Sequence, residues 1–248
     1  MPLVLCMRLR GTVDHWDPKL LDALAAEREV IVFDNRGTAA SSGAAPTTID
    51  GLADGGVAFI RALGLQQVDV LGWSLGGIVA QGIGLHAPEL VRRLVIAGST
   101  PAGVPDQPSP PARVGSILGH AVNDDEDYLY LFFPESDQGR TAGLESLRRL
   151  DVRLGQSLAA VQDSAYHAQL GAIATFGGYY DRLGELKLPV LVANGAHDVM
   201  INSYASYVMS QKLPDAKVVL YSDAGHGFLF QHSDDFAHDV NRFLEVNR

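Results

Sequence analysis

The strongest constraint on the fold is a set of short apolar runs that do not alternate with polar residues. Six such runs recur along the 248-residue chain, and stretches with helical periodicity lie between them. Runs of this kind are typical of parallel strands that are buried on both faces of a sheet. The alternation therefore predicts an α/β fold with a doubly wound, mostly parallel sheet. The predicted strands are Val4–Met7, Val30–Phe33, Val68–Leu71, Leu94–Ala97, Val190–Ala193 and Val218–Leu220.

Helix starts are marked by residues that satisfy free backbone N–H groups. Asp17 precedes Pro18, and we expect Asp17, Thr48 and Ser233 to cap helices, because Asp, Thr and Ser are favoured at that position and proline fits the first turn. A further helix is expected over Leu75–His86.

The strand–helix pattern breaks between about Ser99 and Leu186. A proline-rich segment, Pro101–Pro111, reads as an irregular linker, and only helical stretches follow it. We therefore expect a helical insertion over residues 99–186, and a core formed by residues 1–98 and 187–248. A long insertion at the end of a strand commonly has a binding function. Its predicted helices include Asp125–Phe133, Gly143–Leu154 and Leu158–Ala174.

Composition limits the partners of the chain. The formal net charge of −10 argues against nucleic acid and against anionic membrane surfaces. Cys6 is the only cysteine, which excludes an intramolecular disulfide and argues against a cysteine-based metal site. The opening apolar run is short and has its arginines after it, unlike a signal peptide, so we expect a cytoplasmic protein. We expect a small-molecule substrate, no cofactor and no metal. The sequence is compatible with a homo-oligomer.

One short motif, Gly72-Trp73-Ser74-Leu75-Gly76, indicates a catalytic role. A sharp turn from a strand into a helix crowds the residues two places before and after its centre, which favours glycine there. The central serine is then exposed at the N-terminus of a helix, where free N–H groups stabilise developing negative charge. G-x-S-x-G also occurs by chance, but here it follows a predicted strand and precedes a predicted helix. We therefore predict that Ser74 is a nucleophile.

A serine nucleophile needs a base, and the base needs an orienting acid. His226 lies in a glycine-flanked loop that follows the last predicted strand, which favours it over the other histidines. Asp198 follows the strand Val190–Ala193, so it is expected at the same edge of the sheet. Asp223 is nearer to His226 in sequence but reads as a turn residue.

The order Ser74, Asp198, His226, together with the serine turn, resembles the α/β-hydrolase superfamily. Asp34-Asn35-Arg36-Gly37 is similar to the D-x-R-G turn of that family, and Leu188-Pro189-Val190-Leu191 to the strand before its acid. The resemblance spans nearly the whole chain. It implies that Ser74 is the nucleophile, His226 the general base and then acid, and Asp198 the residue that orients the histidine. The N–H of Leu75 would be the first oxyanion donor.

Three features depart from that family. The loop after the first strand carries Arg8 where glycine is usual; Leu9 would supply the second oxyanion N–H, and Arg8 either enters the site or is solvated. Ala39 stands where a second glycine is common. The usual leading hairpin is missing, which predicts six strands or a start that lies upstream.

The resemblance also predicts a helical cap over the substrate pocket, with some of its aromatic residues lining an apolar site. Arg8 and Trp73 are candidate substrate-binding residues, although Trp73 fits equally well in the core below the serine.

The expected activity is hydrolysis of a small, largely apolar carboxylic ester or lactone through an acyl-enzyme. Two enzymatic alternatives keep the same three residues: a cofactor-free perhydrolase or haloperoxidase, and a carbon–carbon bond hydrolase. A third alternative is a non-catalytic ligand receptor on a hydrolase scaffold. The receptor alternative is retained because of Arg8: if this residue makes the oxyanion hole defective, catalysis is slowed by roughly a hundredfold or more.

Overall fold

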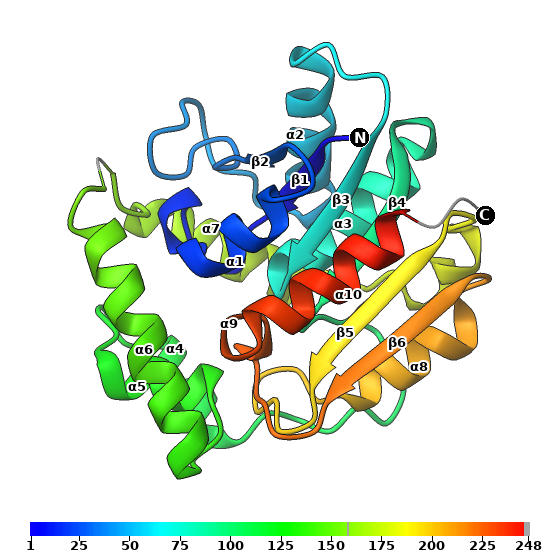
Figure 1. Cartoon of the computed structure of the whole chain (residues 1–248). Helices are drawn as coiled ribbons and strands as arrows, with labels where there is room; N and C mark the ends of the chain where they lie inside the picture. The colour runs from blue at the N-terminus through cyan, green and yellow to red at the C-terminus, as the bar shows by residue number, and fades with distance from the viewer. Residues whose placement is uncertain (158, 246–248) are drawn as a thin grey trace.

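A six-stranded sheet forms the centre of the protein in a computed structural model that describes residues 1–157 and 159–245 (Figure 1). All five pairings between neighbouring strands are parallel, as the sequence predicted. The sheet order is β2-β1-β3-β4-β5-β6. The strands are β1 (Leu3–Cys6), β2 (Val30–Val32), β3 (Val68–Trp73), β4 (Val91–Ala97), β5 (Val190–Gly195) and β6 (Ala216–Tyr221), so all six predicted strands are confirmed with small shifts at their ends.

The four inner strands of the sheet are buried on both faces, which explains their apolar runs, whereas the edge strands β2 and β6 are partly exposed. In β1, Val4 packs into one hydrophobic cluster, while Leu3 and Leu5 pack into the other. The same alternation holds along β3, β4 and β5. Because successive side chains of a strand point to opposite faces, a strand covered on both faces needs an apolar residue at nearly every position.

Helices cover both faces of the sheet. One face is packed by α2 (Ile49–Ala62), α3 (Leu75–His86) and α8 (Tyr204–Lys212), and the other by α1 (Pro18–Ala25) and α10 (Ser233–Glu245). Short helical turns complete the fold: η1 (Val13–His15), η2 (Pro88–Leu90), η3 (Tyr180–Glu185) and α9 (Phe228–Gln231).

Two of the three predicted caps are confirmed. The Asp17 carboxylate accepts the Lys19 N–H at the start of α1, and the Thr48 hydroxyl accepts the Gly51 N–H at the start of α2. The prediction for Ser233 was wrong. This residue is the first residue of α10, and its hydroxyl donates to the Phe230 carbonyl 3.0 Å away.

The segment between β4 and β5 contains four α-helices and no strand among its described residues. Figure 1 shows α4, α5 and α6 grouped to one side of the sheet, near α1 and α9. The predicted helices are present with other ends, and Leu158, the predicted start of one of them, lies outside the described residues. The division into residues 99–186 and two flanking core segments, the second of which includes the undescribed residues 246–248, stays a prediction. The four helices are α4 (Ala112–Leu118), α5 (Asp125–Phe132), α6 (Asp137–Leu154) and α7 (Asp163–Thr175).

The strand order reverses between β1 and β3. The chain passes from β1 outward to β2, then returns to place β3 on the other side of β1. In open parallel sheets, ligands bind at the carboxyl ends of the strands beside such a reversal. The two strands end level with each other, because Cys6 pairs with Gly72. The loops that follow β1 and β3 carry Leu9 and Ser74, so the fold places these residues at the expected crevice.

The residues that the structure describes contain neither a membrane-spanning helix nor a cluster of metal-binding side chains. No helix there is long and apolar enough to cross a membrane. No three His, Cys, Asp or Glu side chains come together there in a way that could hold a metal ion. The cytoplasmic location stays a prediction.

Candidate active site

Ser74 occupies the sharp turn between β3 and α3 with an unusual backbone conformation. Its φ is 58° and its ψ is −123°, a combination that a side chain bearing Cβ rarely adopts. Hydrogen bonds on both sides hold this strained residue in place. The Ser74 N–H donates to the Ala97 carbonyl at 2.9 Å, and the Ser74 carbonyl accepts from the Ser99 hydroxyl at 2.7 Å. Strain that is held in this way is a common feature of functional sites.

The glycines on either side of Ser74 are required by contact with backbone atoms. A Cβ on Gly72 would lie 2.1 Å from the Gly76 carbonyl oxygen, and a Cβ on Gly76 would lie 2.0 Å from the Cys6 carbonyl oxygen. Neither neighbour is a side chain that can rotate away. The close approach of α3 to the ends of β1 and β3 therefore depends on the absence of side chains at these two positions.

His226 and Asp198 form a buried pair. Nδ1 of His226 lies 2.7 Å from Oδ2 of Asp198, and both side chains are fully buried. The other carboxylate oxygen, Oδ1, accepts the backbone N–H groups of Met200 and Ile201, each at 2.8 Å. The carboxylate is thus fixed by its own loop and points one oxygen at the histidine. This arrangement sets the orientation of the imidazole and places a proton on Nδ1.

The opposite nitrogen of His226 is unpaired. Nε2 is buried and has no hydrogen-bond partner among the described residues. His226 and Ser74 both line one small cavity of about 70 Å³. A buried nitrogen without a partner is costly unless a ligand or a reacting proton uses it. Nε2 is therefore available to a ligand or a reacting proton, and its residue lines the cavity that Ser74 also lines.

Trp73 lies beneath His226 and not on the cavity wall. It is fully buried, and its Nε1 donates to the His226 carbonyl at 3.1 Å. Its ring packs against those of Trp16, Phe132 and His226. Of the two interpretations from the sequence, the core position is the one that the structure shows, so Trp73 is corrected from a substrate-binding to a supporting position.

The cavity combines residues from the core with residues from the helical insertion. The loop after β1, the serine turn and the histidine loop form its core side. The insertion contributes mainly apolar and aromatic side chains from α4, α5 and α7. The lining residues are Arg8, Leu9, Arg10, Ser74, Leu118, Asn123, Tyr128, Leu131, Phe132, Tyr166, Met200 and His226.

Two backbone N–H groups are placed as candidate oxyanion donors. Leu75 is the first residue of α3, so its N–H has no acceptor within the helix. Leu9 sits in a tight turn in which the Gly11 N–H donates to the Arg8 carbonyl at 3.2 Å and Arg10 has a φ of 55°. Leu9 lines the same cavity as Ser74. The loop thus still forms a tight turn although Arg8 stands where glycine is usual, and a turn here is compatible with a role of the Leu9 N–H as oxyanion donor.

Arg8 lies in the site. Its guanidinium carbon is 5.1 Å from the centre of the Phe132 ring and 5.6 Å from that of Trp73. Burial, and to a lesser degree the charge of Arg10, lowers the pKa of Arg8 to about 10. Since this value is still above neutral pH, the side chain remains a cation there. Of the two interpretations from the sequence, a position at the site fits this geometry better than a fully solvated side chain, although Arg8 is only partly buried.

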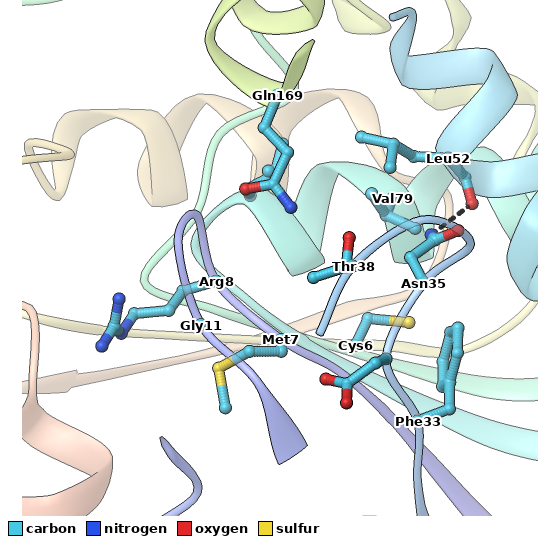
Figure 2. Close-up of a pocket in the computed structure, with 12 residues that line it drawn as sticks. Cys6, Met7, Arg8, Gly11, Phe33, Asn35, Thr38, Leu52, Val79 and Gln169 are labelled. Atoms are coloured by element: carbon cyan, nitrogen blue, oxygen red, sulfur yellow. Dashed lines mark hydrogen bonds between the residues drawn. The ribbon is translucent and has the colours of Figure 1, made fainter. Parts of the chain in front are cut away.

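A second, smaller pocket lies on the other side of the loop after β1. It has a volume of about 30 Å³ and is lined by residues that include Leu75, Asn35, Thr38 and Gln169. Figure 2 shows the Gln169 side chain reaching toward this pocket and the Arg8 guanidinium pointing away from it. The space suffices for a water molecule. The Thr38 hydroxyl is buried there without a partner among the described residues.

The other residues considered for the roles of base and orienting acid make different contacts. Oδ1 of Asp223 lies 2.9 Å from Nε2 of His232 near the surface, whereas the carboxylate partner of His226 is Asp198. His197 is exposed. His120 contacts Asp127 within the insertion.

Several cavity residues could not be found from the sequence. Tyr128, Phe132 and Tyr166 line the site, but they belong to an insertion with several other aromatic residues, so nothing in the sequence distinguished them from packing residues. Arg10 also lines the cavity. Its guanidinium donates to the His120 carbonyl at 2.9 Å and lies 4.5 Å from the centre of the Tyr166 ring, which ties the loop after β1 to the insertion.

Comparison with known proteins places this geometry in a family. The family model described as an alpha/beta hydrolase fold matches residues 2–233. A solved structure, described as an alpha/beta hydrolase fold protein from Chitinophaga pinensis, is 32% identical with a TM-score of 0.89, over 100% of this chain and 90% of that chain.

Curated relatives are more distant in sequence. The protein from Azorhizobium caulinodans named "Putative carbamate hydrolase RutD" is 26% identical, over 92% of this chain and 84% of that protein. The pimeloyl-[acyl-carrier protein] methyl ester esterase from Aromatoleum aromaticum is 28% identical, over 68% of this chain and 70% of that protein.

Proposed function

Because the chain belongs to the α/β-hydrolase family and is a hydrolase, we propose that it cleaves a small carboxylic ester or lactone, with Ser74 as nucleophile, His226 as base and Asp198 as orienting acid. One observation carries the proposal. His226 pairs with buried Asp198 through Nδ1, while its other nitrogen is unpaired and the ring lines the same cavity as Ser74. A serine, a histidine with a free nitrogen and a fixed carboxylate are the parts that nucleophilic acyl transfer needs.

In the first half of the reaction, Ser74 Oγ attacks the substrate carbonyl carbon while His226 Nε2 takes the hydroxyl proton. The carbonyl π electrons move to oxygen and give a tetrahedral oxyanion. When this intermediate collapses, the bond to the alcohol oxygen breaks, and His226 returns the proton to the leaving alcohol. For a lactone, the alcohol stays attached to the acyl group. The product of this half-reaction is an acyl ester on Ser74.

In the second half, water replaces the alcohol. His226 Nε2 takes a proton from the water, whose oxygen attacks the acyl carbon. Collapse of the second tetrahedral intermediate breaks the bond to Ser74 Oγ, which recovers its proton from His226. The products are the free acid and the starting enzyme. Throughout both halves, Asp198 stays ionised and stabilises the positively charged imidazole.

The oxyanion is assigned to the N–H groups of Leu75 and Leu9. The Leu75 N–H lies at the N-terminus of α3, where the helix dipole adds partial positive charge. The Leu9 N–H belongs to the turn after β1, beside the same cavity. Fixed donors of this kind favour the transition state because they need no rearrangement as charge develops.

The cavity favours a small substrate. Its volume of about 70 Å³ is far below the several hundred Å³ of sites for drug-sized ligands. Leu118, Leu131 and Met200 supply apolar contacts, and Tyr128, Phe132 and Tyr166 supply aromatic ones. These walls fit a short acyl chain.

The proposal is tested by hydrolysis of p-nitrophenyl esters of increasing acyl length. We expect wild-type turnover to peak at a short acyl chain, and Ser74→Ala to lower kcat by roughly a thousandfold or more. Ser42→Ala, at an exposed serine, is the matched control and should behave like wild type. The absence of turnover in folded wild-type protein, or unchanged turnover in Ser74→Ala, would overturn the proposal.

A further inference from the structure

The Arg8 guanidinium has unused hydrogen-bond donors beside the catalytic cavity. Its Nη1 donates to the Leu9 carbonyl at 2.8 Å. Its Nε is buried without a partner among the described residues. The Nε–Nη2 edge of the guanidinium therefore has no acceptor within the part of the chain that the structure describes. This edge is one of the two that pair with a carboxylate through two parallel hydrogen bonds.

Arg8 also has no protein anion to balance its charge. None of the ion pairs formed by the described residues includes Arg8. The titratable groups that interact with its cation are Arg10, which repels it, the Tyr128 hydroxyl, and His15, whose protonation it opposes. Arg8 also lines an outer cleft of about 360 Å³, whose other lining residues include Asp124, Asp125 and Asp151. These three carboxylates form no ion pair with Arg8.

The position of the cation is set by two aromatic rings that also hold the histidine. The Arg8 guanidinium packs on Phe132 and Trp73, as described above, and the His226 ring lies 5.7 Å and 5.6 Å from the same two rings. Cation–π contacts orient a guanidinium over a ring but leave its N–H groups, which lie in its own plane, without acceptors. Arg8 is therefore held one ring away from His226, while its Nε–Nη2 edge has no acceptor among the described residues.

We infer that Arg8 binds a carboxylate on the substrate, so that the enzyme acts on esters or lactones that carry a negatively charged carboxylate a few atoms from the reacting carbonyl. A carboxylate supplies two acceptors in one plane for the Nε–Nη2 edge and balances a partly buried cation. It is also planar and small enough for the cavity. This inference rests on the proposed function of Ser74 and narrows its substrate class.

A negatively charged substrate runs against the long-range effect of the protein's net charge. The formal charge of −10 mildly disfavours anionic substrates at long range. A single partly buried arginine in the site acts at short range and in a less polar medium, where its charge is screened much less than surface charges are. The local cation therefore decides the charge of the bound group.

The test compares esters of equal chain length and different charge. Monomethyl glutarate carries its carboxylate on the acyl side, and methyl hexanoate is its neutral counterpart. The pair 3-acetoxypropanoate and butyl acetate places the charge on the alcohol side. Acid release is followed by titration at constant pH. We expect wild type to prefer the charged member of at least one pair by about tenfold or more in kcat/KM.

Variants of Arg8 separate charge recognition from support of the loop. Arg8→Gln should remove the preference, mainly by raising KM for the charged ester, so that kcat/KM falls by about tenfold more for the charged ester than for the neutral one. Arg8→Lys keeps the charge without the planar fork and should give an intermediate preference. Arg61→Gln, which removes an exposed arginine paired with Glu89, is the control for net charge. If Arg8→Gln lowers kcat/KM equally for the charged and the neutral ester, Arg8 only supports the loop after β1, and the inference is overturned.

A binding measurement distinguishes the failure of this inference from the failure of the proposed function. Glutarate is titrated into Ser74→Ala protein and into the Ser74→Ala, Arg8→Gln double variant by calorimetry, and binding is expected in the first only. Ser74-dependent hydrolysis of neutral esters without charge preference would leave the proposed function standing and refute the role of Arg8. Arg8-dependent glutarate binding without turnover of any ester would support the carboxylate site and refute the proposed chemistry.

Discussion

Nδ1 of His226 and Oδ2 of Asp198 lie 2.7 Å apart, although 28 residues separate them in the chain. Parallel pairing of β5 and β6 makes this contact. The two strands run level, with Gly195 opposite Tyr221, so the loops that follow them emerge together at the same edge of the sheet. The Ala224 carbonyl accepts the His197 N–H at 2.9 Å and joins the two loops directly. The relationship therefore follows from strand register rather than from sequence proximity.

Replacing Asp198 tests this relationship. Asp198→Asn keeps the size of the side chain but removes its charge and changes its hydrogen-bond pattern toward Nδ1. We expect ester turnover to fall by roughly a thousandfold or more, because the histidine loses its orientation and the stabilisation of its charged form. Asp223→Asn is the matched control, because Asp223 contacts His232 at the surface. A larger loss of kcat in Asp223→Asn than in Asp198→Asn would contradict the assignment of Asp198 as the orienting acid.

The glycine after the serine turn is expected to be essential for folding. In Gly76→Ala, the new Cβ would lie 2.0 Å from the carbonyl oxygen of Cys6, which is backbone and cannot rotate away. We expect the free energy of unfolding to fall by at least about 3 kcal/mol, as for severe overpacking. Gly171→Ala, at an exposed and open position of α7, should instead raise it by about 0.5–1 kcal/mol. Urea denaturation measures both, and equal effects of the two substitutions would contradict the argument.

His15 is expected to make stability depend on pH. Burial, and then the charge of Arg8, lowers the pKa of His15 to about 3 in the folded protein. The ring is held neutral, because its Nδ1 accepts the Thr12 N–H at 3.0 Å. The unfolded chain takes up a proton near the ordinary histidine pKa of about 6.5. The stabilisation is therefore present above pH 6.5 and is lost as the pH falls from 6.5 toward 3.

The size of this effect follows from the same values. At pH 5.5, His15 should lower the free energy of unfolding by up to about 1.4 kcal/mol relative to pH 7.5. In His15→Asn, the difference between urea denaturation at the two pH values should shrink by that amount. His167→Asn, at an exposed histidine of α7, should leave the difference unchanged. An identical pH response of His15→Asn and wild type would show that His15 titrates normally in the folded protein.

Much of the core could be predicted because burial on both faces leaves a strong pattern. The six strands, and α3 over Leu75–His86, were found from apolar runs and helical periodicity. Sheet order could not be found in this way, since the placement of β1 between β2 and β3 depends on how the helices cross over. The cap at Ser233 was misjudged because a serine at a helix start can bond backward, as it does to Phe230. Ala39 shows a further limit: its φ is 49°, a conformation that favours glycine, yet the sequence has alanine.

The candidate site residues that the structure brings together share one signal in the sequence, because each follows a predicted strand. Ser74, Asp198 and His226 each follow one, and the structure brings His226 beside Asp198 and places His226 and Ser74 at one cavity. The environment of Arg8 and Trp73 depends on the insertion, because Phe132 from α5 packs against both. Contacts between segments so far apart in the chain leave no local pattern. The sequence therefore showed that Arg8 was unusual but not where its side chain lies.

The nucleophilic role of Ser74 is tested most directly by covalent labelling. The protein is treated with a fluorophosphonate, which reacts with activated serines, and the modified peptide is located by mass spectrometry. We expect one adduct, on the peptide that holds Ser74, with no adduct in Ser74→Ala and much slower labelling in His226→Ala, while Ser42→Ala labels like wild type. Failure of folded wild-type protein to react, or an adduct on a residue other than Ser74, would contradict the account.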